Sequence, residues 1–427
     1  MEKDNPERTR WWIAAAAVVM QLCLGTVYAW SIFKKPMMSA HGWSETQTQG
    51  AFMIYAAVFA LAVAFGGRLI DTKGPRIIGA IGGALFGTGL LLSGLANTLE
   101  HIWMLYIAYG IIAGLGGGFG YITPVTTLIR WFPDKRGLVT GLAVMGYGLG
   151  SFVMGNIGPS LIMKSGVATT FFIWGAISLV VVLCMVTLLK NPPENWHPAS
   201  SRPVHADTDT VSAAVSFTFS QAARTPQFWI LWLILFLTVT AGLGLISQLS
   251  PMAQDVMKAA FGGEPSAEQI KSIVIISGTI VAIGAIFNGI GRLAWAWTSD
   301  AVGRKAVFAA LFITQAAGYI LLAHAGGLLP FAALACYLLA CYGGSLASLP
   351  AFVADEFGPE HIGKIYGTIF TACAVAGIVG PYIFARIKEL TGSFQVALYI
   401  ESALLLAGFV LAVTFQKPSM STQGKNG

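Results

Sequence analysis

The sequence predicts an all-α membrane protein with twelve transmembrane helices in two six-helix halves. Hydrophobic residues make up 56% of the 427 residues and charged residues only 10%, against about 25% charged in a soluble domain. The mean hydropathy is +0.71. The apolar runs are long and rich in Ala, Gly and Leu, which favours helices over short barrel strands. Two motifs recur at nearly equal spacing in both parts of the chain, which indicates an internal duplication.

Each apolar run can cross about 30 Å of hydrocarbon at about 1.5 Å per residue. In chain order, the expected spans are 11–33, 50–70, 76–97, 101–129, 136–163, 168–190, 226–249, 270–299, 305–324, 330–355, 363–390 and 394–416. The fourth span includes a glycine-rich run at 114–120. This run lacks the spacing of a phosphate-binding loop and indicates close contact between helices.

The distribution of Lys and Arg predicts the orientation. If both termini are cytoplasmic, the cytoplasmic segments hold 17 of these residues and the outer segments hold 7, which with Arg292 inside the membrane make the 25 of the chain. We therefore expect a multi-pass protein of a cell's inner (plasma) membrane, with both termini in the cytoplasm. The same scattered basic loops account for the net charge of +6 without a nucleic-acid partner.

The longest polar stretch divides the chain. Residues 191–225 contain four prolines together with Ser, Thr and Asp, a composition typical of a linker. The expected parts are an N-terminal six-helix half at 1–190, a cytoplasmic linker at 191–225 and a C-terminal six-helix half at 226–427.

Two loops share an acid, a glycine and a base. Residues 71–76, Asp-Thr-Lys-Gly-Pro-Arg, follow the second span, and residues 300–305, Asp-Ala-Val-Gly-Arg-Lys, follow the eighth span 229 residues later. The acid can complement helix ends across the interface between the halves, and the glycine permits a tight turn. A pair of glycines four apart opens both the fifth and the eleventh spans, 226 residues apart. The expected gating residues of these loops are Asp71, Arg76, Asp300 and Arg304.

These paired loops resemble the signature loop of the major facilitator superfamily, and the resemblance covers essentially the whole chain. Three segments look like the oxalate/formate antiporter family: Arg130-Trp-Phe-Pro-Asp-Lys-Arg-Gly137, Gly146-Tyr-Gly-Leu-Gly150 and Arg224-Thr-Pro-Gln-Phe-Trp229. Asn288 and Arg292 on the eighth span resemble both that family and the related monocarboxylate transporters. The resemblance implies the major facilitator fold, a central binding site between the halves and transport by alternating access.

Arg292 is a charge within an apolar run. A guanidinium stays ionised, and at the bilayer centre it costs at least about 2.5–3.5 kcal/mol. At helical spacing, Asn288 and Arg292 share a small, polar face with Ala285, Ala296 and Ser299. Since no Asp or Glu is expected in the middle of another span, we predict that Arg292 binds a substrate carboxylate in a bidentate pair, with Asn288 bonded to the guanidinium or to the ligand. A structural ion pair is the alternative.

The resemblance also implies residues that line the pocket. Tyrosine hydroxyls can donate to a carboxylate, and aromatic rings exclude water. Ordinary helix packing is an equal alternative for each aromatic residue. The expected lining residues are Tyr28, Tyr121, Tyr342, Phe370, Leu24 and Met145.

Cys373 limits the expected substrate. In the oxalate/formate family, a Lys on the eleventh span accompanies the Arg, so that two cations meet a dianion. The corresponding position here is Cys373. Because one fixed cation suits one carboxylate, we expect a small monocarboxylate such as lactate or pyruvate.

The sequence leaves the coupling open between two modes. Eukaryotic monocarboxylate carriers pair an Asp with this Arg and use a Lys on the first span, whereas the positions here hold Asn288 and Ile32, with Lys34 and Lys35 beyond at the outer mouth. We expect proton symport, with the proton on Glu401, near the outer end of the last span, or on the substrate's own carboxylate. Anion exchange of the oxalate/formate type is the alternative.

Other functional classes are not favoured. The sequence shows no paired carboxylates, metal-ligand cluster or nucleophile–base set, so we expect no enzyme, no metal and no cofactor. The linker is too short for the output domain of a sensor. The expected partners are a small monocarboxylate anion, a proton and the lipid bilayer, and the expected functional unit is a monomer.

Overall fold

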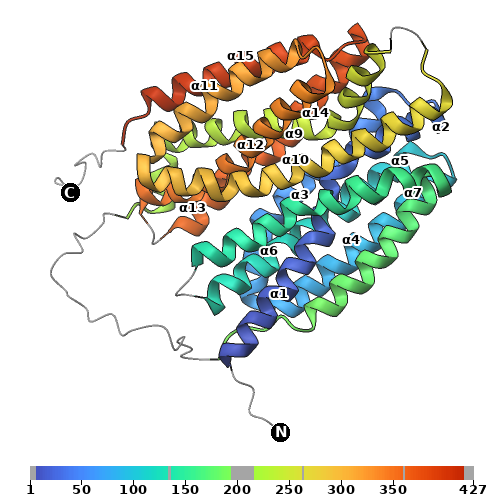
Figure 1. The fold of residues 1–427 in the computed structure, drawn as a ribbon. Helices are drawn as coiled ribbons and strands as arrows, with labels where there is room; N and C mark the ends of the chain where they lie inside the picture. Colours follow the sequence, from blue (N-terminus) through green and yellow to red (C-terminus); the bar gives the residue numbers. More distant parts are fainter. Residues whose placement is uncertain (1–5, 133–135, 194–215, 262–263, 359–360, 418–427) are drawn as a thin grey trace.

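The computed structural model describes residues 6–132, 136–193, 216–261, 264–358 and 361–417. The helices lie side by side in a bundle (Figure 1). In chain order the elements are α1 (Pro6–Leu24), η1 (Gly25–Ala29), α2 (Trp30–His41), α3 (Glu45–Lys73), α4 (Pro75–Thr98), α5 (Ile102–Leu105), η2 (Tyr106–Ala113), α6 (Gly114–Trp131), α7 (Arg136–Val186), α8 (Phe219–Ala223), α9 (Pro226–Ala259), α10 (Ala267–Val302), α11 (Arg304–Ala323), α12 (Leu328–Phe357), α13 (Ile362–Ile369), α14 (Ala372–Thr391) and α15 (Gln395–Thr414).

The described residues contain eleven helical stretches long and apolar enough to cross a membrane. One of them, Gly141–Val186, lies in α7 and has a break at Gly166, where φ is 81°. Glycine adopts this conformation readily because it has no Cβ. The two arms of α7, at 136–165 and 167–186, correspond to the expected fifth and sixth spans. When the arms are counted separately, the twelve expected spans are present.

The first helical stretch is longer than the expected span at 11–33. It begins at Pro6 and continues through the 3-10 turn η1 to the end of α2 at His41. The following loop is only three residues long, because Gly42 ends α2 with φ of 67° and Ser44 opens α3 with a capping box. Lys34 and Lys35, expected just beyond the first span, lie inside α2 instead.

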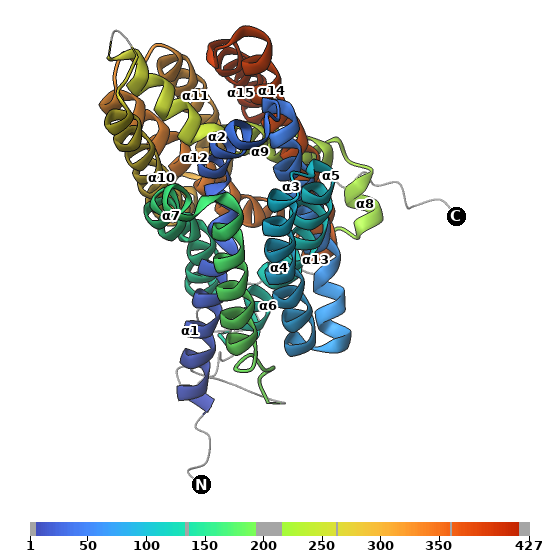
Figure 2. The same ribbon diagram turned by 90° about the vertical axis from the view of Figure 1, so that its right-hand side faces the viewer.

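The bundle has two sides. Helices α1 to α7 form one side, drawn from blue to green, and α9 to α15 form the other, drawn from yellow to red (Figures 1 and 2). Between the sides, α7 packs against α10, α3 against α14, and α2 against α9. These three contacts border the central region where the sequence predicts the binding site.

The glycine-rich run at 114–120 makes the close helix contact that the sequence predicts. A Cβ added at Gly116 of α6 would lie 2.2 Å from the backbone nitrogen of Phe86 in α4. No side chain larger than hydrogen fits that separation, so α4 and α6 touch through their backbones.

The expected linker at 191–225 is described only at 191–193 and 216–225. Its last residues pack against the second side of the bundle. The backbone N–H of Phe217 donates to the carbonyl oxygen of Phe357 at 2.9 Å. The Lys364 ammonium lies 4.8 Å from the ring centre of Phe219 in α8. The chain is therefore joined to α12 and α13 before α9 begins.

Candidate functional site

Helix α10 presents one polar face to the bundle interior and one apolar face outward. Asn288 and Arg292 are 2% and 4% exposed, whereas Ile290 and Trp297 are 54% and 74% exposed. The outward face of Phe287, Ile290, Leu293 and Trp297 suits lipid, and the stripe containing Arg292 faces the protein, as the helical spacing predicts.

Asn288 orients the guanidinium of Arg292. The Nε–H group of Arg292 donates to Oδ1 of Asn288 at 3.1 Å, and Nδ2 of Asn288 donates to the carbonyl oxygen of Leu339 in α12 at 3.4 Å. Among the described residues, no Asp or Glu forms an ion pair with Arg292. The guanidinium is therefore held by a neutral amide, and its charge stays available for an anion.

Two glycines enclose this pair of side chains. A Cβ added at Gly148 of α7 would lie 2.9 Å from Oδ1 of Asn288, and one added at Gly343 of α12 would lie 3.1 Å from Cγ of Arg292. Arg292 thus lies where α10 meets α7 on one side of the bundle and α12 on the other.

Tyrosine hydroxyls surround the charge. The Arg292 guanidinium interacts electrostatically with Tyr28, Tyr121, Tyr342 and Tyr366. The hydroxyl oxygens of Tyr28 and Tyr342 are 3.4 Å apart, which joins η1 on one side of the bundle to α12 on the other. The predicted residues Tyr28, Tyr121 and Tyr342 therefore gather around Arg292.

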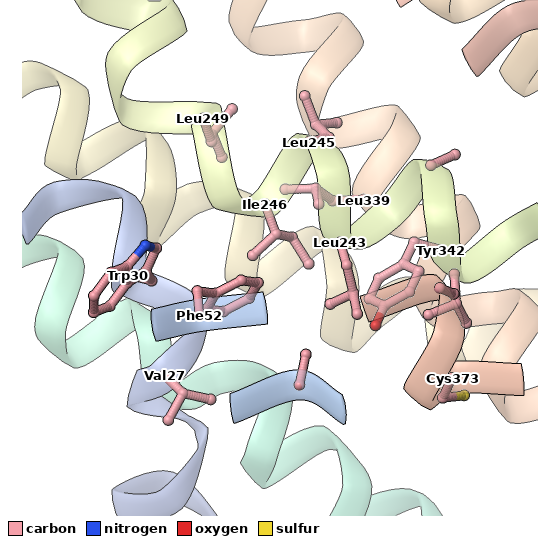
Figure 3. Close-up of a cluster of buried hydrophobic side chains, with 14 of the residues drawn as sticks. Val27, Trp30, Phe52, Leu243, Leu245, Ile246, Leu249, Leu339, Tyr342 and Cys373 are labelled. Atoms are coloured by element: carbon pink, nitrogen blue, oxygen red, sulfur yellow. The ribbon is translucent and has the colours of Figure 1, made fainter. Parts of the chain in front are cut away.

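Cys373 lies in the same group. The side chain, at the start of α14, is 7% exposed and lies near the same four tyrosines. Figure 3 shows it on the helix next to Tyr342, across the buried cluster from Val27, Trp30 and Phe52. The position at which the family resemblance implies a second cation therefore lies near the tyrosines around Arg292 and holds a thiol.

The sequence did not single out Tyr366 as a pocket residue. Its ring lies 5.8 Å from that of Phe370, one helical turn later, and it shares the electrostatic contact with Arg292. The sequence pattern that could have identified Tyr366 is its spacing of one helical turn from Phe370, a predicted lining residue. Tyr147, which is 2% exposed, packs against the rings of Tyr28 and Tyr121 at 5.2 and 5.0 Å.

Leu24 and Met145 lie beside the site in contacts between helices. Leu24 is fully buried against Gly120 of α6, and Met145 of α7 faces Gly289 of α10. Gly120, which Leu24 contacts, directly precedes the predicted residue Tyr121 in the sequence. Gly289, which Met145 contacts, directly follows Asn288.

The space at the centre is narrow. A cavity of about 10 Å³ is lined by Tyr28, Gly148, Ser151, Ile246, Asn288 and Leu339, among others. This volume holds about one water molecule. A carboxylic acid does not fit into this cavity in the conformation that the structure shows.

The paired loops make contacts within one side of the bundle. Asp71 pairs with Arg130, and Nε of Arg76 donates to the carbonyl oxygen of Leu189 at 2.8 Å. Arg304 pairs with Asp300 at 2.6 Å and with Asp355 at 2.8 Å. Among the side chains that the structure describes, these contacts lie within one side of the bundle, and the expected contact of the acids across the interface stays a prediction. Their turns follow the prediction, since Gly74 and Gly303 have φ of 81° and 101°.

Polar contacts across the interface occur at the opposite end, which we name the predicted outer end. Lys34 is fully buried, pairs with Glu45 and donates to Oε1 of Gln248 in α9 at 2.6 Å. Lys35 pairs at 2.6 Å with Asp255, which Lys388 also contacts at 2.7 Å. The two lysines thus close this end of the bundle and do not line an open mouth.

Comparison with known proteins gives a consistent result. The sequence matches the Major Facilitator Superfamily over residues 15–381 and 266–426. It is 29% identical to the oxalate:formate antiporter of Oxalobacter formigenes over 414 residues, which cover 96% of this chain and 92% of the relative. It is 24% identical to monocarboxylate transporter 13 of Bos taurus over 423 residues, covering 96% and 90%. It is 23% identical to apicoplast pyruvate carrier 1 of Toxoplasma gondii over 495 residues, covering 92% and 86%.

Proposed function

The chain belongs to the Major Facilitator Superfamily, and we propose that this transporter carries small monocarboxylates, of the size of lactate or pyruvate, in symport with a proton. The substrate would bind between the helices before and after the linker, pair with Arg292, and leave on the other face after the two halves, 1–190 and 226–427, rock about it. This is alternating access around a fixed site near the bilayer midplane.

The observation that carries the proposal is a buried cation that no Asp or Glu neutralises among the described residues. Arg292 is 4% exposed and its Nε–H is bonded to the neutral amide of Asn288. A carboxylate would supply the missing negative charge and accept two parallel hydrogen bonds from the guanidinium. The hydroxyls around it can donate to the same carboxylate or to the polar group on its α-carbon.

The charge count favours one carboxylate per substrate. Cys373 and the four tyrosines are neutral neighbours of the guanidinium, so binding a monocarboxylate leaves the centre without net charge. A dianion would carry one uncompensated charge into a nearly dry cavity, which is costly. Oxalate is therefore a poorer fit than lactate or pyruvate.

A specific observation favours anion exchange as the second candidate. The residue bonded to Arg292 is Asn288, an amide that cannot titrate, and one relative is named an oxalate:formate antiporter. An exchanger of monocarboxylate anions needs no proton-binding residue at the site. The two modes share the substrate site. They differ in the return step, in which an exchanger carries a second anion back and a symporter returns with its site empty.

Location follows from the proposal and from the charge distribution. We place the protein in the inner (plasma) membrane of a bacterium, with both termini in the cytoplasm and a single chain as the working unit. In this orientation the end closed by Lys34, Lys35 and Asp255 is the outer end, and the structure is closed toward the outside.

The test is uptake of labelled lactate into proteoliposomes, with and without an inward proton gradient, and with oxalate and formate as competitors. We expect uptake that the gradient increases and that pyruvate inhibits more strongly than oxalate. Uptake that depends only on anion inside the vesicles would establish exchange in place of symport.

A single substitution tests whether Arg292 binds the substrate. Arg292→Ala should abolish uptake, since it removes the only fixed charge placed against the carboxylate, while the amount of protein in the membrane stays similar. The control is Arg68→Ala, which removes an exposed arginine of α3 and should leave uptake unchanged. Lactate uptake retained in Arg292→Ala would overturn the assignment.

A further inference from the structure

Glu401 is a buried carboxyl group that the proposed site does not use. It lies on α15, is 0% exposed, and neither side-chain oxygen has a hydrogen-bond partner. Helices α11, α9 and α14 pack against α15. An ionised carboxylate without a donor is very costly to bury, so this group either holds a proton here or gains a donor in another conformation.

The residues buried beside it on α15 are apolar except Ser402, whose hydroxyl donates to the carbonyl oxygen of Ala316 in α11 at 2.9 Å. Ala397, Leu398 and Leu405 on the same helix are buried with it. Tyr319 of α11, which is 1% exposed, lies close enough for the charge of Glu401 to act on its phenol. The other titratable side chains of α9, α11, α14 and α15 lie at helix ends, at the central site or on the exposed surface: Asp255, Lys258, Arg304, Lys305, Cys373, Tyr382, Arg386, Lys388, Glu389 and Tyr399.

Tyr319 connects Glu401 to the central site through α9. Its hydroxyl donates to the carbonyl oxygen of Ala241 at 2.7 Å. The next residue, Gly242, touches the ring of Tyr342, since an added Cβ would lie 2.1 Å from Cδ2 of that ring. Tyr342 in turn lies 3.4 Å, oxygen to oxygen, from Tyr28 beside Arg292. Two consecutive residues of α9, Ala241 and Gly242, therefore link the phenol of Tyr319 to the tyrosines of the binding site.

The position of Glu401 along α15 also suits access of a proton from the outer solution. Glu401 is the seventh residue of α15. At about 1.5 Å per residue it lies roughly 9 Å below the predicted outer end of its helix. A proton from the outer solution has only a short distance to travel when the helices at this end part.

We propose that Glu401 is the proton-binding site of this transporter, a proposal that rests on the proposed symport. A proton from the outer solution binds the carboxylate and leaves to the cytoplasm later in the cycle, one with each monocarboxylate. When Glu401 is ionised, the hydroxyl of Tyr319 donates to its carboxylate in a charge-assisted hydrogen bond and no longer to Ala241. When Glu401 is protonated, the hydroxyl donates to the carbonyl oxygen of Ala241 again. The protonation state thereby alters the hydrogen bonding of α9 beside Tyr342.

Glu401→Gln tests this proposal, because glutamine keeps the size and polarity of the side chain but cannot titrate. A pH difference of one unit can drive about a tenfold accumulation of a substrate that moves with one proton. We expect the variant to lose this accumulation in proteoliposomes and to keep exchange of labelled for unlabelled lactate at equal pH within about twofold of the unmodified protein. A side chain with only a packing role would lower both activities together.

Two controls complete the design. Glu268→Gln neutralises an exposed carboxylate of α10 and should retain the accumulation. Tyr319→Phe removes the connecting donor but leaves the carboxyl group, and should shift the pH dependence of uptake without abolishing exchange. Accumulation in Glu401→Gln equal to that of the unmodified protein would overturn the proposal.

An infrared measurement separates this proposal from the proposed function. The carbonyl stretch of a protonated carboxylic acid should appear in the unmodified protein and be missing from Glu401→Gln. Its absence from both would overturn the proton site whatever the protein transports. If this band titrates but lactate transport does not respond to the pH gradient, Glu401 is a proton-binding site and the proposed symport is wrong.

Discussion

The site around Arg292 can satisfy the guanidinium with or without an anion. A tyrosine hydroxyl accepts one hydrogen bond and donates another, so the phenols of Tyr28 and Tyr342, now 3.4 Å apart, can accept from the empty guanidinium and donate to a bound carboxylate. A fixed acid in the same place would neutralise Arg292 permanently and compete with the substrate. Neutral, amphoteric neighbours thus allow binding and release, which a carrier needs equally.

Cys373→Lys should widen the substrate range toward dianions. A second cation near the tyrosines would compensate the second charge of oxalate, and a hydrogen bond to a charged group contributes about 1.5–3 kcal/mol, which corresponds to about tenfold or more in affinity. We expect oxalate to inhibit lactate uptake at about tenfold lower concentration in this variant than in the unmodified protein.

Cys373→Met is the matched control for this change, because it enlarges the side chain without adding charge. It should leave the inhibition by oxalate weak. If Cys373→Lys still transports lactate and oxalate competes no better than before, the charge at this position does not determine the substrate.

The sequence predicted the residues on one helix better than those brought together from several. Asn288 and Arg292 are four residues apart, so helical periodicity alone places them on one face. Tyr366 and Gly148 reach the same point only because α13 and α7 pack toward α10 and α12, and no spacing in the sequence expresses that packing. The neutral Cys373 was found through family resemblance, not through any physical pattern.

Helix α10 is held closely by a helix from each side of the bundle. A Cβ at Gly155 of α7 would lie 2.7 Å from the carbonyl oxygen of Gly278, and one at Gly291 would lie 2.1 Å from that of Ala340 in α12. Small residues permit this approach, since backbone-to-backbone packing drives helix association in lipid. The contact of α7 with α10 belongs to the interface that must change during transport.

Gly148→Ala should weaken substrate binding through Asn288. The new methyl group would lie 2.9 Å from Oδ1 of Asn288 and 3.6 Å from Nε of Arg292, so the amide must move and its bond to the guanidinium is lost. Because such a bond contributes about 1.5–3 kcal/mol, we expect the KM of lactate uptake to rise about tenfold.

Gly141→Ala on the same helix is the comparison. Among the described residues, its methyl group would meet the end of the Leu293 side chain, at 3.3 Å, which can move aside. Its KM should stay near that of the unmodified protein. Equal effects of the two substitutions would indicate general disturbance of α7 and not a role for Asn288.

Element boundaries were hardest to predict where distant partners stabilise polar residues. Lys34, Lys35 and Pro36 together resemble the end of a span, yet α2 continues through them to His41. Lys34 remains buried because Gln248, 214 residues away, accepts its hydrogen bond, and Lys35 is paired with Asp255. The break in α7, by contrast, falls at Gly166 in the short loop expected between two spans, because only glycine adopts that backbone conformation at little cost.

The predicted outer end carries several polar contacts, some of which join the two sides of the bundle. Lys35 of α2 and Lys388 of α14 share Asp255 of α9, and the hydroxyl and backbone N–H groups of Thr46 in α3 donate to Glu389 of α14. The lysines and Asp255 are partly exposed, so each pair contributes at most about 1 kcal/mol. Weak contacts of this kind can close an end of the molecule and still open in each cycle.

Covalent closure of this end should therefore stop transport. In a Cys184→Ser background, which removes an exposed native thiol, Lys35→Cys with Asp255→Cys places one thiol on each side of the bundle. A bifunctional thiol reagent should abolish lactate uptake in this variant, and a reductant should restore it, because the two halves can then separate again. Asp255→Cys with Lys388→Cys places both thiols on the α9 to α15 side, so the same reagent should leave uptake intact. Uptake that survives cross-linking between α2 and α9 would mean that this end does not open during transport, and the two halves could not work by rocking about Arg292.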